Sequence, residues 1–414
     1  MSVNNPTLFQ ASTLLNEIVA QATGQKNIAA ASVGDFVSVA TTAIKTGYDP
    51  ILNAMSQVLN RTIVAVRPYK EKYASLYNTA ERWGNITRKV SFVDSDVVDD
   101  GRFAYPAGYD STQDPATGNG LSVDMYKLAK PEVLQTCFYG QSVFEDDLSI
   151  FRDSLDVAFR DPEEFMRFTS GIMTNRYNKL AQYRENIGRG LILNLMGSLY
   201  YIANAVSPLG DSMRVVHLLT EYNTETGKSL TTTTVMDPDN YPAFMRWVYA
   251  RIGTLADMFT ERTSVYQTTI NGKTVRRHTD AEDLRLFVLS KYLRQMDSMA
   301  RAVTFHENLL ELAEVESIAY WQDIKTPDQI SLANTISLTG ADGSVIETAL
   351  ALSGTLSNVF GIMFDRDAAG YAVVNEWSAM TPFNTKGGYW NEHVHVNFRT
   401  RQDTTEKSVL LLLD

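Results

Sequence analysis

GIMFDRD at residues 361–367, NEHVHVNF at 391–398 and SVLLLL at 408–413 are the segments that decide the fold. The first and the last contain apolar runs typical of buried strands, and the middle one alternates between polar and apolar residues. A charged turn, Asp365-Arg366-Asp367, ends the first run. No catalytic constellation accompanies these strands, so we expect them to complete a structural edge. The pattern favours an assembly protein over an enzyme.

The composition is that of a globular protein. Of the 414 residues, 44% are hydrophobic and 21% charged, which is enough to bury a core in two or three domains. The formal net charge of -11 argues against a general nucleic-acid binder, because phosphates are neutralised by clustered Lys and Arg. The single cysteine, Cys137, cannot form an intrachain disulfide and is expected to be a small buried side chain in a reducing cytoplasm. Residues 1–10 show no secretion signal.

The first third of the chain changes from helical to strand-rich character. Residues 1–61 carry thin apolar stripes at helical spacing, and Asp49-Pro50 is a typical helix start, so we expect a helical arm that packs on something else. Residues 62–131 contain short β-branched runs and the turn-rich segment 105–120, YPAGYDSTQDPATGNG. Because such long excursions are uncommon in compact domains, we expect this one to reach another subunit.

A long helix is predicted next. Asp161-Pro162-Glu163-Glu164 supplies an N-cap, a proline at the first position and acids in the first turn. The pattern runs towards Tyr201 for about forty residues, with possible breaks at Gly188 and Gly190. The uncharged stretch 190–210 resembles a membrane span, but its polar side chains would be costly in hydrocarbon, so a buried helix is favoured.

The following segments mix helices and strands without a repeat. A helix is predicted from Asp237-Pro238, and a hairpin at 267–275, where Asn-Gly suits a type I′ turn. A strand at 284–289 leads into a helix from Tyr292 to about Leu312. Short strands around residues 340–343 precede Phe364. The predicted fold class is α+β.

Several patterns suggest chemistry, and each is better explained by structure. Thr226-Gly227-Lys228-Ser229 resembles the end of a phosphate-binding loop, but Tyr222 stands where the first glycine is required. His393 and His395 share one face of a strand, yet no Cys, Asp or third His stands at ligand spacing beside them, so packing at an interface is favoured over a metal pair. No Ser or Cys has a recognisable base partner. We therefore predict no catalytic, cofactor-binding or metal-binding residue.

An acidic run lies in the extended loop and consists of Asp94, Asp96, Asp99 and Asp100. It lacks the twelve-residue calcium loop with its glycine and terminal glutamate, so a solvated acidic face is favoured over a calcium site. We expect this face to pair with a basic patch on a neighbour, either Arg276-Arg277 or Arg399 with Arg401.

The order of the segments resembles one family, the tailed-phage major capsid proteins of the Hong Kong 97 fold, and in particular the branch of small short-tailed phages. The likeness lies in Asp283–Ser290 with the helix that follows it, in Gly361–Asp367, and in Gly388–Asn391 with His395-Val396 before the closing strand. The order of arm, strand-rich loop, long helix, axial domain and C-terminal strand covers nearly the whole chain.

The resemblance implies the parts of a shell subunit. Residues 1–61 correspond to an N-terminal arm, 62–131 to an extended β-hairpin loop, 132–208 and 359–414 to a peripheral domain with the spine helix and C-terminal strands, and 209–358 to an axial domain. The implied function is a non-enzymatic subunit that assembles into pentamers and hexamers of an icosahedral or prolate head. The shell encloses double-stranded DNA without sequence-specific binding.

The resemblance also implies partners and a location. Scaffolding, portal and decoration proteins are candidate partners, no membrane or cofactor is involved, and the subunit is expected in the virion capsid after assembly in the host cytoplasm. An encapsulin-like cellular nanocompartment shares the fold and stays open as an alternative, as does an enzyme or ligand-binding protein that uses the axial domain. The candidate intersubunit contacts are Asp94, Asp96, Tyr105, Tyr109, Arg276, Arg277, Arg399 and Arg401.

Overall fold

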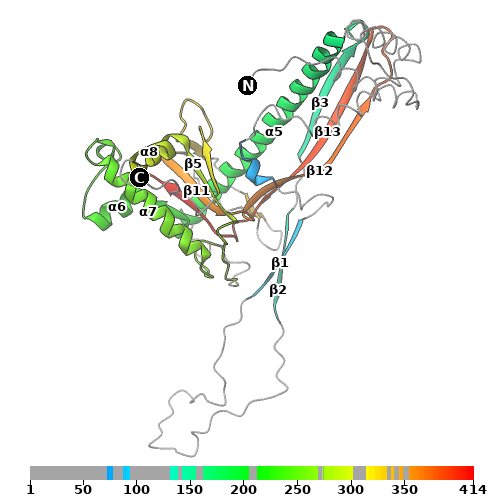
Figure 1. Cartoon of the computed structure of the whole chain (residues 1–414). Coiled ribbons are helices and arrows are strands. Elements are labelled where there is room, and N and C mark those ends of the chain that lie inside the picture. The colour runs from blue at the N-terminus through cyan, green and yellow to red at the C-terminus, as the bar shows by residue number, and fades with distance from the viewer. Residues whose placement is uncertain are drawn as a thin grey trace, which may run out of the picture.

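The computed structural model describes residues 72–77, 87–93, 131–138, 142–154, 162–204, 212–268, 273, 275–301, 314–332, 337–339, 345–347 and 354–414. These residues form two lobes, the first built on a three-stranded sheet and the second on a five-stranded sheet, and long strands join them (Figure 1). A two-stranded ribbon leaves the body where the lobes meet. The predicted arm at 1–61, the loop tip at 105–120 and the Asn-Gly turn lie outside the described residues.

The longest element is helix α5 (Pro162–Asn204), which runs for 43 residues. Gly188 and Gly190, predicted as possible breaks, do not interrupt it. A Cβ at Gly188 would lie 2.7 Å from the Cβ of Tyr73, so this glycine permits close contact with the segment that contains η1 (Ala74–Leu76). The later half of α5 buries the apolar side chains Leu191, Ile192, Leu195, Met196, Leu199 and Ile202.

The stretch that resembles a membrane span is therefore part of a core helix over residues 190–204. Among the described residues, no helix combines the length and the apolar character needed to cross a membrane.

A three-stranded antiparallel sheet accompanies α5 in the first lobe (Figure 1). Its order is β12 (Ala369–Met380), β13 (Tyr389–Gln402) and β3 (Ser142–Phe151). Burial alternates along β13, as the sequence pattern predicts, up to Phe398. There the phase shifts by one residue, opposite a register shift in β12 between Val373 and Asn375.

A five-stranded sheet forms the core of the second lobe. Its order is β4 (Val215–His217), β14 (Ser408–Leu412), β11 (Val359–Asp365), β5 (Leu284–Leu289) and β6 (Glu314–Ile318). All residues of β5, β11 and β14 are buried, so the apolar runs are the buried strands that the sequence predicts. The central strand β11 approaches β5 closely, because a Cβ at Gly361 would lie 2.5 Å from the carbonyl oxygen of Phe287.

The C-terminal strands are divided between the two sheets. The resemblance placed residues 359–414 in the peripheral domain, but β11 and β14 pair with β5 and β4, which come from the segment expected to be axial. The physical reason is that these two strands are apolar on both faces and need a sheet whose two faces are covered. The last strand thus completes the five-stranded sheet, whereas β12 and β13 belong to the three-stranded sheet.

Three helices lie in the second lobe: α6 (Leu218–Thr226), α7 (Tyr241–Thr260) and α8 (Ser290–Arg301). Helix α7 begins four residues after the predicted start at Asp237, because the Asp237 carbonyl accepts hydrogen bonds from the backbone of Asn240 and Tyr241 in a turn. Helix α8 is described as far as Arg301, and its predicted end near 312 lies outside the described residues. Gly227 ends α6 in the left-handed conformation (φ 68°), which makes the Thr226–Ser229 segment a polar turn after a helix.

Small elements complete the fold. The predicted short strands near residue 340 are β8 (Ser337–Thr339) and β9 (Val345–Glu347), which pair with each other. A second pair consists of β7 (Ile330–Leu332) and β10 (Gly354–Leu356). Short 3-10 turns, η3 (Ser212–Arg214) and η4 (Thr234–Met236), precede β4 and α7.

Candidate intersubunit ribbon and its anchor

The projecting ribbon consists of β1 (Thr87–Phe92) and β2 (Val133–Phe138), and its two faces differ in chemistry. Strand alternation places Lys89 and Ser91 on the more buried inner face and Val90 and Phe92 on the outer face. Val90, Phe92 and Val133 are 55%, 60% and 52% exposed, and Phe92 lies directly opposite Val133. Exposed apolar side chains gathered in this way indicate a surface that packs on another molecule.

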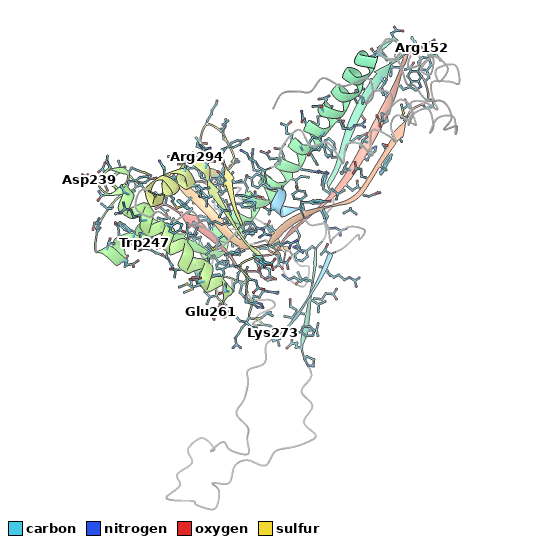
Figure 2. All side chains as sticks on the ribbon, in the orientation of Figure 1. Arg152, Asp239, Trp247, Glu261, Lys273 and Arg294 are labelled. Atoms are coloured by element: carbon cyan, nitrogen blue, oxygen red, sulfur yellow. The ribbon has the colours of Figure 1, made fainter. Side chains whose placement is uncertain are left out.

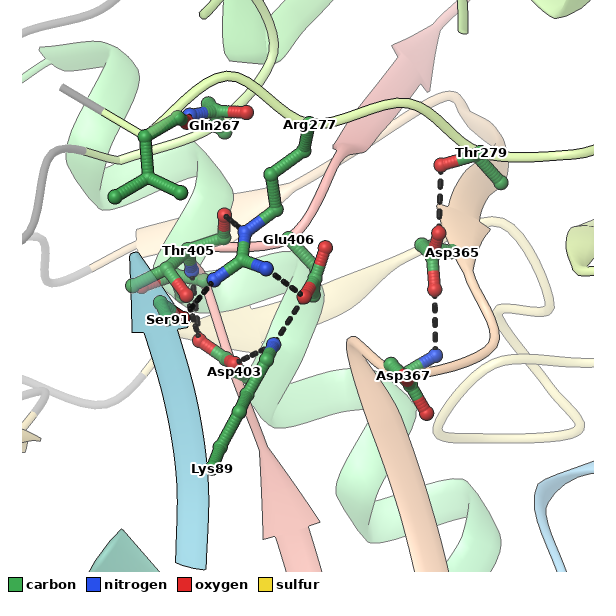
Figure 3. Close-up of polar contacts among 12 residues, drawn as sticks. Lys89, Ser91, Gln267, Arg277, Thr279, Asp365, Asp367, Asp403, Thr405 and Glu406 are labelled. Atoms are coloured by element: carbon green, nitrogen blue, oxygen red, sulfur yellow. Dashed lines mark hydrogen bonds and ion pairs between the residues drawn. The ribbon is translucent and has the colours of Figure 1, made fainter. Parts of the chain in front are cut away.

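The inner face of the ribbon is held by a polar cluster, the anchor, formed by Lys89, Arg277, Asp403 and Glu406 (Figure 3). Lys89 Nζ donates to Asp403 Oδ2 at 2.5 Å and also to Glu406. Arg277 Nη1 lies 3.0 Å from Glu406 Oε1, and Arg277 Nη2 donates to Ser91 Oγ at 2.9 Å. Two residues of β1 are therefore tied to the segment between β13 and β14.

The two carboxylates of the anchor differ in how firmly they are ionised. Burial favours a higher pKa for Asp403, but the charge of Lys89 and the hydrogen bonds from Lys89 and Thr405 outweigh it and hold the pKa below its usual value. Burial dominates at Glu406 and raises its pKa, and Lys89 and Arg277 offset only part of that effect. Asp403 is thus the firmly charged partner of Lys89, and Glu406 is the member that protonates first.

Two further cations hold the segment that carries Asp403 and Glu406, and both are fully buried. Arg214 Nη1 donates to the Ser408 carbonyl at 2.8 Å, and Arg214 Nη2 donates to Thr268 Oγ1 at 2.9 Å. Lys407 Nζ donates to carbonyls at the end of α7, including that of Phe259 at 3.0 Å, which a helix leaves without internal partners. Burial lowers the pKa of Lys407 to about 8.

The charged turn after β11 lies beside the anchor (Figure 3). Asp365 accepts hydrogen bonds from Thr279 Oγ1 at 2.6 Å and from the backbone N–H of Asp367 at 2.7 Å. Burial raises the pKa of Asp365, and these two hydrogen bonds offset part of the rise. Of the three residues of the turn, Asp365 is thus buried at the root of the ribbon, whereas Arg366 and Asp367 are exposed.

The predicted intersubunit contacts do not gather in one place. Asp94, Asp96, Tyr105 and Tyr109 lie outside the described residues, so their role stays a prediction. Arg276 is exposed on the segment that leads to Arg277, and its role also stays a prediction. Arg277 is partly buried and uses its guanidinium in the anchor of its own subunit.

Arg399 and Arg401 belong to the subunit interior. They are 1% and 9% exposed. Arg399 Nη1 donates to Thr87 Oγ1 at 3.2 Å and Arg401 Nη2 to Asp367 Oδ1 at 3.0 Å. Beyond Phe398 the face of β13 that carries Arg399 and Arg401 is buried, and Arg399 contacts β1 there, so both side chains lie at the root of the ribbon.

Sequence reasoning missed most of the anchor. Lys89, Asp403 and Glu406 were not singled out, and the available signal was the charged run between two strands at 403–407. The expected burial of Cys137 is only partly met, because this residue lies half-exposed on β2, where Gln135 Nε2 contacts its sulfur at 3.2 Å. Lys273 and Glu132 add an exposed ion pair of 2.8 Å beside the ribbon, and Figure 2 shows Lys273 there.

A long spine helix, two lobes and a projecting ribbon with an apolar outer face define a subunit of the Hong Kong 97-type capsid class. The sequence profile of the Phi29-like phage major capsid protein family matches residues 15–411, and the chain belongs to that family. It is therefore a tailed-phage shell protein that forms a homo-oligomeric capsid, and not an enzyme. The α+β capsid fold and the shell function predicted from the sequence are confirmed; the narrower short-tailed branch stays a prediction.

Solved structures of phage capsids resemble the chain at low sequence identity. A chain of the capsid of Staphylococcus phage Andhra is 8% identical, with 84% of this chain and 86% of that chain covered and a TM-score of 0.49. A chain in the structure of head fiber and inner core protein gp22 of native bacteriophage P68 is 10% identical, with 82% and 83% covered and a TM-score of 0.48. A chain of Mycobacterium phage Che8 is 10% identical, with 84% and 93% covered and a TM-score of 0.39. No curated protein sequence matches the chain.

Proposed function

We propose that the subunit assembles into pentamers and hexamers that enclose double-stranded DNA, and that the outer face of the ribbon packs on a neighbouring subunit. The observation that carries this proposal is the combination of Val90, Phe92 and Val133 on the exposed face with the anchor on the opposite face. The exposed apolar face suits docking on another chain, and the anchor holds the root of the ribbon in place.

The energetic argument concerns repetition. Fully burying an apolar side chain is worth about 1.5–3 kcal/mol, so covering the exposed half of each of these three is worth about 1 kcal/mol apiece. That gain is small for one contact, but a closed shell repeats the contact at every subunit. The anchor reduces the ordering cost of docking, because the root of the ribbon is already held before a neighbour arrives.

The domain roles follow from the same assignment. We infer an arm at 1–61, an extended loop at 62–131 that includes the ribbon, a peripheral domain built on α5 and an axial domain built on the five-stranded sheet. The net charge of -11 suits a container for DNA, because few cationic clusters are available to hold the genome by its phosphates. Assembly in the host cytoplasm with scaffolding, portal and decoration proteins is part of the proposal.

The test replaces Phe92 with aspartate in the full-length protein. We expect Phe92→Asp to keep the folded state, because the side chain is 60% exposed, and to abolish particles in electron microscopy and velocity sedimentation. Gln135→Ala is the matched control. Gln135 lies on the same outer face, opposite Val90, and replacing it with alanine removes little apolar area. Normal particles from Phe92→Asp, or equal loss of particles from Gln135→Ala, would contradict the ribbon contact.

Two further measurements separate the parts of the proposal. If Phe92→Asp loses its cooperative thermal unfolding, the milder Val133→Ser tests the same face, and unchanged assembly of a folded Val133→Ser subunit counts against the contact. The content of particles from an infected host tests the other half, since nuclease-protected DNA supports a virion shell. Cargo protein in place of DNA would instead indicate a nanocompartment.

A further inference from the structure

One face of the three-stranded sheet brings two histidines and two carboxylates together. In the register of β3 and β13, His393 lies directly opposite Asp147 and His395 directly opposite Glu145. Because side chains alternate along a strand, all four project from the same face, and the buried Trp390, Val394 and Val396 point to the other. The sequence shows the histidine pair alone, since Glu145 and Asp147 stand almost 250 residues earlier.

Glu145, Asp147 and His393 lie close enough together to share an ion, and His395 contacts Glu145 beside them. His393 Nδ1 lies 2.5 Å from Asp147 Oδ1 and 3.8 Å from Glu145 Oε1. His395 Nε2 lies 3.8 Å from the same Glu145 Oε1. The ligand atoms of Glu145, Asp147 and His393 all lie within 4.8 Å of one another. Two ligands of a tetrahedral ion at 2.0–2.1 Å are about 3.4 Å apart, and the separations of 2.5 Å and 3.8 Å each differ from that value by less than about 1 Å.

The surroundings of these side chains favour their movement towards a bound ion. Asp147 and Glu145 are 63% and 54% exposed, so their side chains are free to rotate about a bound ion. His395 is held more firmly, because its ring stacks on Trp377 of β12 with centroids 4.1 Å apart and planes 22° from parallel. A rigid imidazole beside adjustable carboxylates is a suitable arrangement for capture of a cation. Two neighbouring carboxylates on one face also repel each other until a cation lies between them.

We infer that Glu145, Asp147, His393 and His395 form a binding site for a divalent transition-metal ion of the Zn²⁺ class. Imidazole nitrogen with carboxylate oxygen is a typical ligand set for such ions, whereas Mg²⁺ and Ca²⁺ prefer oxygen ligands alone. The inference is independent of the proposed ribbon contact, which lies on β1 and β2.

A bound ion has a mechanical consequence for the sheet. Strand β3 lies at the edge in the order β12-β13-β3, so it is held by hydrogen bonds to β13 alone within the sheet. An ion shared by side chains of β3 and β13 adds a second tie between the edge strand and the sheet. The ion thus stabilises the folded form in proportion to its occupancy.

The test is calorimetric titration of the purified full-length protein with Zn²⁺. We expect saturable binding of one ion per subunit, a rise in the midpoint of thermal unfolding with Zn²⁺, and no competition from excess Mg²⁺. His393→Ala and the isosteric Asp147→Asn should each weaken binding by at least about 10-fold, the lower bound for losing even an outer hydrogen-bond partner of a metal site. Asn391→Ala is the matched control, because Asn391 lies on the same face and pairs with Ser149 next to the cluster.

The outcomes are distinct. Absence of saturable Zn²⁺ binding to the unmodified protein overturns the inference and leaves the cross-strand contacts of the two histidines with Glu145 and Asp147. Equal binding by Asp147→Asn, His393→Ala and Asn391→Ala also overturns it, because the ion then binds elsewhere. If His393→Ala does not fold, Asp147→Asn decides the question, since it preserves the shape of the exposed side chain.

Discussion

Replacing Lys89 with methionine should release the root of the ribbon. The change removes the cation shared by Asp403 and Glu406, which are 2% and 7% exposed in their side chains. Removing one partner of a buried ion pair costs about 3–5 kcal/mol, because the remaining charge stays buried without compensation. Glu406 keeps Arg277 at 3.0 Å and Asp403 keeps the hydrogen bonds from Thr405, so we expect the lower end, about 3 kcal/mol.

The matched control is Lys273→Met. Lys273 also pairs with a carboxylate beside the ribbon, Glu132 at 2.8 Å, but the two side chains are 46% and 50% exposed. Exposed ion pairs contribute at most about 1 kcal/mol, so this variant should change little. The comparison separates the effect of burial from the loss of one lysine near the ribbon.

The assay is urea unfolding together with hydrogen exchange of the β1 and β2 amides. Lys89→Met should lower the free energy of unfolding and speed exchange in the ribbon, while α7 amides keep their protection. A double variant with Asp403→Asn should cost less than the sum of the single changes by about 1 kcal/mol or more, because the asparagine no longer carries a stranded charge. Additive costs, or equal effects of Lys89→Met and Lys273→Met, would refute the role assigned to the anchor.

Three other predictions concern single sites. Gly361→Ala should lower the free energy of unfolding in urea by about 1–3 kcal/mol, because the added Cβ would overlap the Phe287 carbonyl. Gly354→Ala should be tolerated, because open space surrounds the position of its Cβ. Folding lowers the pKa of Lys407 from 10.5 to about 8, so between these pH values the unfolded chain binds more protons than the folded chain. The free energy of unfolding should therefore rise from pH 8 to 10.5 by at most about 3 kcal/mol, measured relative to Lys407→Met. A difference between the two proteins that does not change with pH would contradict this prediction. The hydrogen bond to Asp414 raises the pKa of His217, so this contact stabilises the fold below pH 6.5 and loses its effect as the pH rises through the folded-state pKa of His217. The Thr220 amide, which donates to the Asp414 carbonyl, should then lose protection in hydrogen exchange. Protection that stays constant over this pH range would count against the contact.

The regular elements could be read from the sequence because their signals are local. The apolar runs that became β5, β11 and β14 need no knowledge of their neighbours, and the proline and acids at the start of α5 are local as well. The pairing of the strands with one another could not be predicted in this way. Nothing in the run 408–413 indicates that β14 pairs with β4 and β11.

The polar sites were harder to predict because each combines residues that are far apart in the chain. Arg399 and Arg401 look like surface cations on an alternating strand, and their burial depends on distant residues such as Thr87 of β1, which Arg399 contacts. His393 and His395 gain their carboxylate neighbours from β3, which is paired with β13 across more than 240 residues. Composition and periodicity carry no information about such juxtapositions.

The anchor also constrains the order of events during synthesis. Lys89 precedes its partners Asp403 and Glu406 by 314 and 317 residues. At 5–20 residues per second the ribosome needs roughly 15–60 s to cover that distance. The root of the ribbon therefore cannot be fastened until the segment that carries Asp403 and Glu406 has been synthesised. A chain that stalls before residue 403 lacks these contacts, so under the proposed ribbon contact such a chain should dock on a neighbour less readily than a chain that contains them.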